Sequence, residues 1–179
     1  VDRDDLKDMG SILWAETVQA IRRLNPNTTL ETLIPDFQGI HKHLDRIVAV
    51  APEVISHNME TVKRLTRAVR IQARYERSLE VLRYLKEAGA NRTKTGLMLG
   101  LGETREEVIE TLHDLRAHEV DVVTLGQYLQ PSKKHLPVVE YITPEQFKEY
   151  ETIGLELGFR HVESGALVRS SYKAQKHIL

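Results

Sequence analysis

Gly96-Leu97-Met98-Leu99-Gly100-Leu101-Gly102-Glu103 is the stretch that decides the fold, because an apolar strand runs here straight into a glycine-rich turn. Glycine has no Cβ atom, so another backbone or a ligand can approach the end of this strand closely. Thr104 and Glu107 have the spacing of a capping box, which predicts that a helix begins directly after the turn. The third glycine of a dinucleotide fingerprint and the Lys-Ser/Thr pair of a phosphate loop are both missing. The stretch therefore predicts the strand–turn–helix unit of an α/β protein.

Strand and helix patterns alternate along the rest of the chain. Apolar runs predict strands at Thr29–Phe37, Val54–His57, Thr95–Leu101, Val120–Leu129 and Phe159–Ser164. Helical patterns cover about Ser11–Leu24, Gly39–Val50, Thr61–Ala68, Tyr75–Ala88, Thr104–His118 and Pro144–Leu157. Strands that are regularly followed by helices pair in parallel through right-handed crossovers. About five strands are too few for an eight-stranded barrel, so we expect a fragment of a larger barrel, truncated at its N-terminal side. A small open α/β sheet is the alternative.

Composition places the chain among globular proteins and excludes several classes. Its 179 residues are enough for one domain with a core. The formal net charge of -1 gives no overall attraction to nucleic acid or to acidic membranes, and no apolar run approaches the ~20 residues that span a bilayer. The first residues lack the pattern of a signal peptide, so an intracellular protein is expected. The chain has no cysteine, and so supplies neither a disulfide nor a thiolate ligand.

Polar residues follow each of the five predicted strands. In parallel α/β folds, ligands bind beyond the carboxyl ends of the strands, so these side chains are expected to share one rim. The polar strand-end residues are Asp36, Asn58, Glu60, Glu103, Gln127, Gln130 and Ser164. Asn58 and Glu60 have the donors and acceptors that ribose hydroxyl groups need. Helix capping before Thr61 accounts for their positions equally well.

Several blocks resemble the lipoyl synthase family of the radical S-adenosylmethionine (radical SAM) enzymes, and together they run through the whole chain. These blocks are Val1–Leu6, Leu33–Phe37, His57–Thr61, Ala73–Leu79, Gly96–Thr104, Leu125–Ser132, His135–Val138 and Arg169–Tyr172. The block from Gly96 to Glu103 fits the wider radical SAM pattern. The Arg-Ser-Ser-Tyr block at Arg169–Tyr172 is far narrower and is nearly diagnostic of lipoyl synthases.

The resemblance implies a parallel (β/α) partial barrel of the radical SAM type over residues 1–168 and an Arg-Ser-Ser-Tyr tail over residues 169–179. It implies two [4Fe-4S] clusters and S-adenosylmethionine as cofactors. One cluster cleaves S-adenosylmethionine reductively, and the resulting radical removes hydrogen from carbons six and eight of a protein-bound octanoyl chain. The other cluster donates sulfur, with Ser170 as its expected serine ligand and Ser171 as the alternative.

The same matching assigns roles to residues around the cofactor, and it implies no catalytic residue beyond the cofactor and cluster ligands. Asn58 and Glu60 are expected to contact the ribose or methionine part of S-adenosylmethionine, and Arg77 or Ser78 its carboxylate. The residues expected to frame the adenine are Glu103, Gln127 and Leu129. Arg74 and Arg169 could bind carboxylates or offset cluster charge; the alternative for both is a salt bridge across helices, which is the favoured role for Arg74.

The implied partners are octanoylated lipoyl carrier domains of 2-oxoacid dehydrogenase complexes, the H protein of glycine cleavage, and an electron donor such as ferredoxin or flavodoxin. Neither nucleic acid nor a membrane is expected, and the implied location is the cytoplasm, or the mitochondrion or plastid of a eukaryote. The family's two cysteine motifs lie upstream of its Val-Asp-Arg-Asp-Asp block, where this chain begins, so this stretch alone is expected to be inactive. A further departure is Met9, where the family tends to have glycine.

Two other functions are compatible with part of these patterns. A sulfur-inserting radical SAM enzyme related to biotin synthase would share the His57–Thr61 and Gly96–Thr104 blocks but lack the Arg-Ser-Ser-Tyr block. A cluster-free barrel remnant that binds a carrier protein would belong to a different functional class. The upstream sequence discriminates among the three, because they predict two, one and no three-cysteine motifs.

Overall fold

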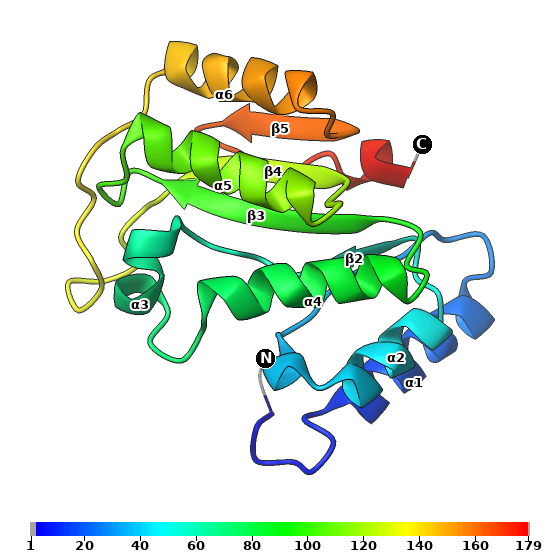
Figure 1. Cartoon of the computed structure of the whole chain (residues 1–179). Coiled ribbons are helices and arrows are strands. Elements are labelled where there is room, and N and C mark those ends of the chain that lie inside the picture. The colour runs from blue at the N-terminus through cyan, green and yellow to red at the C-terminus, as the bar shows by residue number, and fades with distance from the viewer. Residues whose placement is uncertain (1–2, 179) are drawn as a thin grey trace.

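The protein forms a five-stranded, fully parallel sheet in strand order β1-β2-β3-β4-β5 (Figure 1). The structure is a computed structural model that describes residues 3–178, so Val1 and Asp2 of the first family block lie outside the described residues. The strands are β1 (Glu31–Leu33), β2 (Val54–Ser56), β3 (Thr93–Leu99), β4 (Val122–Gln127) and β5 (His161–Gly165). The predicted parallel α/β architecture is confirmed. Because the strand order follows the chain order, the sheet is a segment of a barrel.

Six α-helices connect and flank the strands within the described part of the chain. They are α1 (Ser11–Leu24), α2 (His41–Ala49), α3 (Thr66–Val69), α4 (Tyr75–Glu87), α5 (Arg105–Ala117) and α6 (Pro144–Glu156). Short 3-10 helices cover Phe37–Gly39, Lys63–Leu65 and Ala174–Ile178. Thr104 caps α5 and Thr143 caps α6, each in a complete capping box, as their spacing predicts.

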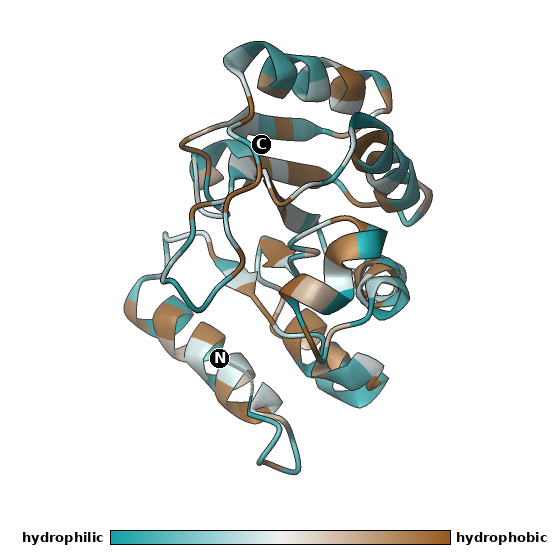
Figure 2. Ribbon diagram, turned by 90° about the vertical axis from the view of Figure 1, so that its left-hand side faces the viewer, coloured by the Kyte–Doolittle hydropathy of each residue, from teal (hydrophilic) through white to brown (hydrophobic). Residues whose placement is uncertain are grey.

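The main apolar core lies between the sheet and helices α4, α5 and α6, which cover one face of it (Figures 1 and 2). Leu97 and Leu99 of β3 and Val123 and Leu125 of β4 point into this core, and each is at most 3% exposed. Side chains alternate between the two faces of a strand. The residues between them therefore point to the opposite, inner face of the sheet.

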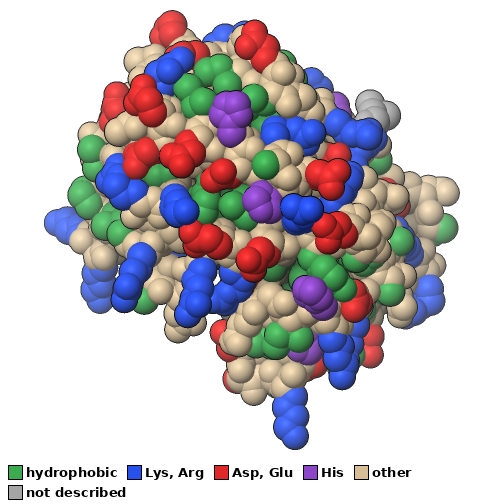
Figure 3. Space-filling view, viewed as in Figure 1, with side chains coloured by type: hydrophobic (Ala, Val, Ile, Leu, Met, Phe, Trp, Pro, Cys, Tyr) green, Lys and Arg blue, Asp and Glu red, His purple; other side chains and the backbone are tan. Residues whose placement is uncertain are grey.

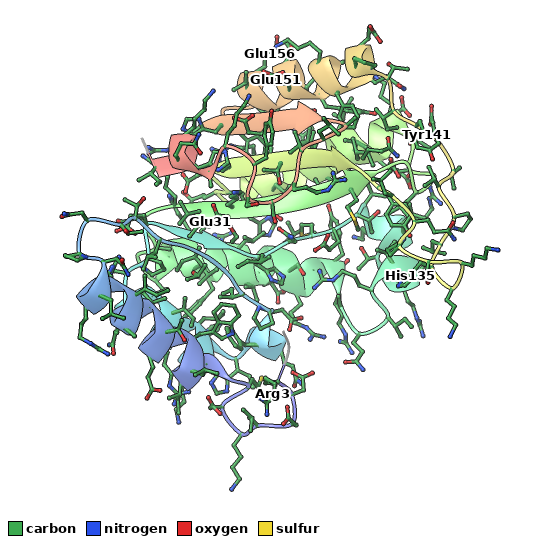
Figure 4. All side chains as sticks on the ribbon, turned by 180° about the vertical axis from the view of Figure 1, so that it is seen from behind. Arg3, Glu31, His135, Tyr141, Glu151 and Glu156 are labelled. Carbon is green, nitrogen blue, oxygen red and sulfur yellow. The ribbon has the colours of Figure 1, made fainter. Side chains whose placement is uncertain are left out.

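The inner face carries polar and small residues and is covered by the C-terminal segment. The positions on this face include Lys94, Gly96, Thr124 and Gly126. A Cβ atom added to Gly126 would lie 2.3 Å from the backbone oxygen of Val168, so the segment crosses β4 in direct contact with it. In Figure 4, which looks onto this side, the C-terminal 3-10 helix lies beside Glu31 of β1.

Several predicted elements have different bounds in the structure. The strand predicted at Thr29–Phe37 pairs over Glu31–Leu33 with one further bond from Ile34 N–H to Ser56, because Pro35 has no N–H to continue the ladder and Phe37–Gly39 then turn the chain away. The strand predicted to start at Thr95 begins at Thr93. The helix predicted over Thr61–Ala68 is a 3-10 turn followed by the short helix α3.

Candidate functional site

A cleft of about 370 Å³ opens on the inner face at the carboxyl ends of β2, β3 and β4. Seven of the residues that the sequence predicts for the site line it: Asn58, Glu60, Gln127, Leu129, Gln130, Arg169 and Ser170. Its floor includes Gly96 of β3 and Gly126 of β4. The parallel sheet thus brings together residues that lie more than a hundred positions apart in the sequence.

Glu60 is held beside β3 by backbone hydrogen bonds on both sides. Its N–H donates to the oxygen of Gly96 over 2.9 Å, and its carbonyl accepts from the N–H of Met98 over 2.8 Å. This pairing fixes Glu60 at a φ of 68°, in the left-handed region that costs an L-residue about 1–2 kcal/mol. Burial raises the pKa of the Glu60 carboxyl, and a hydrogen bond with Asn58 offsets part of that rise. A strained and partly desolvated carboxyl group is characteristic of ligand sites.

Asn58 supplies a polar atom that lacks a partner. Its side-chain oxygen Oδ1 is buried and accepts no hydrogen bond from any described residue. Its carbonyl oxygen is fixed by Arg70, whose Nη1 donates to it over 2.8 Å. Leaving a buried acceptor unpaired costs about 1–3 kcal/mol. Asn58 therefore presents a hydrogen-bond acceptor that a ligand in the cleft would satisfy.

Glycine at position 96 is required by this arrangement. A Cβ atom there would lie 2.9 Å from Thr124 Oγ1 and 3.0 Å from Asn58 Oδ1. Any side chain would push these groups aside and fill the floor of the cleft. The close backbone approach that the sequence predicts for the end of this strand is found at Gly100, where an added Cβ atom would meet the backbone oxygen of Glu140.

Ser170 lies at the wall of the cleft formed by the C-terminal segment, and Leu129 forms part of the opposite rim. Leu129 is 54% exposed, so it offers an apolar surface at the mouth. Arg169 also lines the cleft, and its Nη1 donates to the oxygen of Val168 over 2.6 Å. The tail therefore places one hydroxyl group and one guanidinium group beside Asn58 and Glu60.

Gln127 and Glu103 act mainly on the backbone around the cleft. Gln127 Nε2 donates to the oxygens of Tyr128 and Glu140, and its Oε1 accepts from the N–H of Ile142. These bonds hold the long β4–α6 connection. The Glu103 carboxylate accepts from the N–H groups of Gly100 and Leu101 over 2.6 and 2.9 Å, so it closes the turn and does not line the cleft.

Arg77 and Ser78 lie outside the cleft, in two different environments. Arg77 pairs with Asp36 over 3.1 Å and lines a larger open hollow of about 1390 Å³ on the same rim. Arg67 and Arg74 also line that hollow, and Figure 3 shows basic side chains gathered over α3 and the start of α4. Arg74 is exposed, and no ion pair is found for it among the described residues. Ser78 is buried and shares a 2.9 Å hydrogen bond with Nε2 of His57.

Sequence reasoning missed a polar cluster on the inner face below the cleft. Lys94 Nζ donates to both carboxylate oxygens of Glu31 and to Nδ1 of His177, although the Lys94 side chain is only 1% exposed. The available signal was the charge of Lys94 inside an otherwise neutral strand. Arg70, which fixes Asn58, also went unnoticed, because nothing in its sequence neighbourhood distinguishes it from the nearby arginines.

Comparison with protein-family models places residues 1–115 in the family described as the radical SAM superfamily, and the chain belongs to that superfamily. It is 80% identical over 178 residues to "Lipoyl synthase, mitochondrial" of Nematostella vectensis, covering 99% of this chain and 61% of the relative. It is 78% identical over 179 residues to the lipoyl synthase of Flavobacterium johnsoniae, covering 100% of this chain and 62% of that protein. The chain thus spans about three fifths of these relatives.

Solved structures support the fold independently. The chain matches a crystal structure of methylornithine synthase with a TM-score of 0.64 at 15% sequence identity, covering 87% of this chain and 52% of that one. At this identity the similarity shows the barrel-type fold alone. Within residues 3–178, no helix is both long and apolar enough to cross a bilayer.

Proposed function

We propose that this chain is the S-adenosylmethionine-binding and tail portion of a lipoyl synthase, an enzyme that inserts two sulfur atoms into a protein-bound octanoyl chain at carbons six and eight. The observation that carries the proposal is the meeting of Asn58 and Glu60 with Ser170 at one cleft. The 76–80% identity to proteins named lipoyl synthase supports the particular reaction.

The cleft residues fit S-adenosylmethionine by their chemistry. The orphaned Oδ1 of Asn58 is an acceptor for a ribose hydroxyl or for the amino group of the methionine part. The Glu60 carboxylate accepts from two hydroxyl groups and favours a nearby positive charge, such as that of the sulfonium. The absence of side chains at Gly96 and Gly126 lets Asn58 Oδ1 and the backbone of Val168 lie directly against the two strands, so these groups form the inner surface of the cleft. In this assignment Gln127 and Leu129 frame the adenine, whereas Glu103, Arg77 and Ser78 do not line the cleft.

The residues present supply only one ligand for an iron–sulfur cluster, the Ser170 hydroxyl group. The chain has no cysteine, so the thiolate ligands of both [4Fe-4S] clusters must come from elsewhere in the functional protein. Ser170 is the ligand that this chain supplies, because its position lines the cleft whereas Ser171 does not. When bound, S-adenosylmethionine and the clusters supply the radical, reducing and sulfur-donating chemistry. The chain itself binds and orients them.

The partners in this proposal are an octanoylated lipoyl carrier domain of a 2-oxoacid dehydrogenase complex or the glycine cleavage H protein, and an electron donor such as ferredoxin or flavodoxin. Such partners place the protein in the cytoplasm of a bacterium, or in the mitochondrion or plastid of a eukaryote. The carboxyl ends of the strands are the side from which the carrier would approach, since the cleft opens there.

Substitution of the two neighbouring serines in a full-length protein that carries the cysteine motifs tests the assignment. We expect Ser170→Ala to abolish the lipoyl product while cleavage of S-adenosylmethionine to 5′-deoxyadenosine persists. Ser171→Ala is the matched control and is expected to retain product formation. Damage by Ser171→Ala alone would move the ligand to that residue, and normal product from both variants would refute the serine assignment.

Asn58→Ala tests the cofactor half of the proposal. Loss of the buried acceptor is expected to weaken S-adenosylmethionine binding about 5- to 150-fold, because an unmatched hydrogen bond in a desolvated site costs about 1–3 kcal/mol. Asn25→Ala is the control, since Asn25 is an exposed residue at the end of α1. Unchanged binding by Asn58→Ala, measured by equilibrium titration, would contradict the proposed role of this cleft.

A further inference from the structure

The C-terminal segment that carries Ser170 is anchored by a buried cluster at the opposite end of the inner face. His177 is 0% exposed, and its Nδ1 lies 3.1 Å from Nζ of Lys94. The ammonium group of Lys94 has no acceptor lone pair, so Nδ1 must be the unprotonated acceptor of this bond. A second contact fixes the backbone, because Arg92 Nη1 donates to the oxygen of His177 over 2.7 Å.

Lys94 is itself held in place by β1 and β2. Its Nζ donates to the two carboxylate oxygens of Glu31 over 2.8 and 2.9 Å. Ser56 Oγ donates to the same carboxylate over 2.7 Å. An ammonium group has three N–H donors. Two of them are directed to the Glu31 carboxylate, and the third is directed to Nδ1 of His177. Undocking of the tail would leave a donor of a buried cation unpaired, which is unfavourable in a low-dielectric environment.

Ser170 lies between this cluster and a second anchor. On its N-terminal side, Val168 is buried and its oxygen contacts β4 at Gly126. On its C-terminal side, the next side-chain contact before His177 is the Lys173–Glu163 pair at 3.7 Å, in which Lys173 is 42% exposed. The Glu163 side chain is 15% exposed, but the 3.7 Å separation and the exposed ammonium group make this pair a weaker restraint than a buried hydrogen bond. The buried Lys94–His177 contact is therefore the principal restraint on the chain that follows Ser170.

We propose that Lys94, aligned by Glu31, clamps His177 and thereby positions Ser170 at the cleft, so that Lys94 and His177 are positioning residues for the serine hydroxyl. This inference rests on the proposed function of Ser170. With the clamp closed, the segment from Val168 to His177 is ordered before any ligand binds. With the clamp open, the hydroxyl lies two residues beyond its last anchor, and ligand binding must then order the chain at an entropic cost.

The first test is His177→Ala in the full-length protein before cluster loading, with Gln175→Ala as the matched control. Gln175 lies on the same 3-10 helix and is exposed. We expect His177→Ala to accelerate amide hydrogen exchange at Tyr172 and Lys176, whose N–H groups donate to the oxygens of Arg169 and Lys173 over 2.9 Å, at least tenfold and to leave the amides of β3 and β4 unchanged. Gln175→Ala should leave the tail protected. Unchanged exchange at Tyr172 and Lys176 in His177→Ala would overturn the clamp.

Rescue separates the clamp from a general loss of packing. In His177→Gln the side-chain oxygen can still accept from Lys94, so this variant should regain most of the protection that His177→Ala loses. Lys94→Met alone leaves Glu31 unpaired and risks unfolding, so Lys94→Met/Glu31→Gln is the variant to use. This double variant should accelerate amide exchange in the C-terminal segment as His177→Ala does. Failure of His177→Gln to restore protection, or a protected tail in the double variant, would contradict the proposal.

The link to Ser170 is tested in the cluster-loaded protein by iron content and by the spectrum of the second cluster. We expect His177→Ala to lower the retained fraction of that cluster, as Ser170→Ala does, while S-adenosylmethionine cleavage persists. If His177→Ala loosens the tail and the cluster is fully retained although Ser170→Ala loses it, the positioning role is refuted. If Ser170→Ala itself retains the cluster, the proposed function of Ser170 fails, and the exchange experiment still decides whether the clamp exists.

Discussion

Substitution of Gly100 and of Gly89 by alanine measures how much stability the protein gains from the close contact of the turn after β3 with Gln127 and Glu140. Both glycines adopt left-handed backbone conformations, with φ values of 100° and 101°. A Cβ atom on Gly89 would meet no heavy atom within 4 Å, whereas one on Gly100 would lie 2.3 Å from both Gln127 Nε2 and the backbone oxygen of Glu140. The two substitutions to alanine therefore share the conformational cost and differ in the steric one.

The expected magnitudes follow from that difference. An L-residue in this region costs about 1–2 kcal/mol, which sets the loss for Gly89→Ala. Overpacking against fixed neighbours adds about 1–3 kcal/mol, so Gly100→Ala should lose roughly 2–5 kcal/mol of unfolding free energy. It should also separate Gln127 from Glu140 and so loosen the β4–α6 connection.

Urea unfolding of the two variants and the parent chain measures these losses by linear extrapolation. The slope should stay constant if both variants keep the native fold. A Gly100→Ala loss within about 0.5 kcal/mol of the Gly89→Ala loss would refute the claim that the Gln127–Glu140 contact excludes a side chain at this turn, since such a difference lies near the error of the extrapolation.

Three further outcomes are expected. Burial raises the pKa of Glu60 in the folded state, so the protonated carboxyl stabilises the fold at low pH and this contribution is lost as the pH rises. Glu60→Gln should therefore leave the unfolding free energy at pH 7 unchanged or higher while weakening S-adenosylmethionine binding. A clear loss of stability would contradict this. Asp121→Asn should cost about 2–3 kcal/mol in thermal or urea unfolding, because Asp121 is 5% exposed and bonds Lys86 over 2.6 Å and the Thr93 N–H over 2.9 Å; a loss below about 0.5 kcal/mol would contradict it. Burial, and next the positive charge of Lys94, lower the pKa of His177 to about 4. Docking of the C-terminal segment should therefore be independent of pH above about 6.5 and weaken up to tenfold per pH unit below that. Exchange of the Tyr172 amide, corrected for the intrinsic rate, measures this effect, and equal protection at pH 7 and pH 5 would disprove it. The charged and titratable groups that surround His177 are Glu31, Arg92, Lys94, His161 and Lys176.

Local signals in the sequence were sufficient for the order and type of the main elements. The capping boxes at Thr104 and Thr143 fixed the starts of α5 and α6, because their hydrogen bonds join residues only three positions apart. Short strands were less well defined by the same kind of signal. β1 was predicted too long because its pairing stops before Pro35, which has no N–H, and the chain then turns away at Phe37–Gly39 in left-handed conformations.

Met9 adopts a left-handed backbone conformation, with a φ of 52°, at a position where the resembling family tends to have glycine. Its side chain is 9% exposed and belongs to the apolar cluster with Ile34 and Leu44. Burial of the side chain offsets the backbone cost that glycine would avoid.

The sequence by itself determined the parallel α/β class, the rim at which the polar strand-end residues meet, and several of the residues that line the cleft. It did so because strand–helix alternation fixes the direction of every strand, and direction fixes which ends meet. Only the tertiary structure decided which polar side chains face the cleft and which serve the fold. Glu103 closes its own turn and Ser78 bonds His57, whereas Asn58 keeps a free buried acceptor. The Lys94–His177 clamp likewise joins residues 83 positions apart, because a hydrogen bond depends on distance in space, which no local pattern encodes.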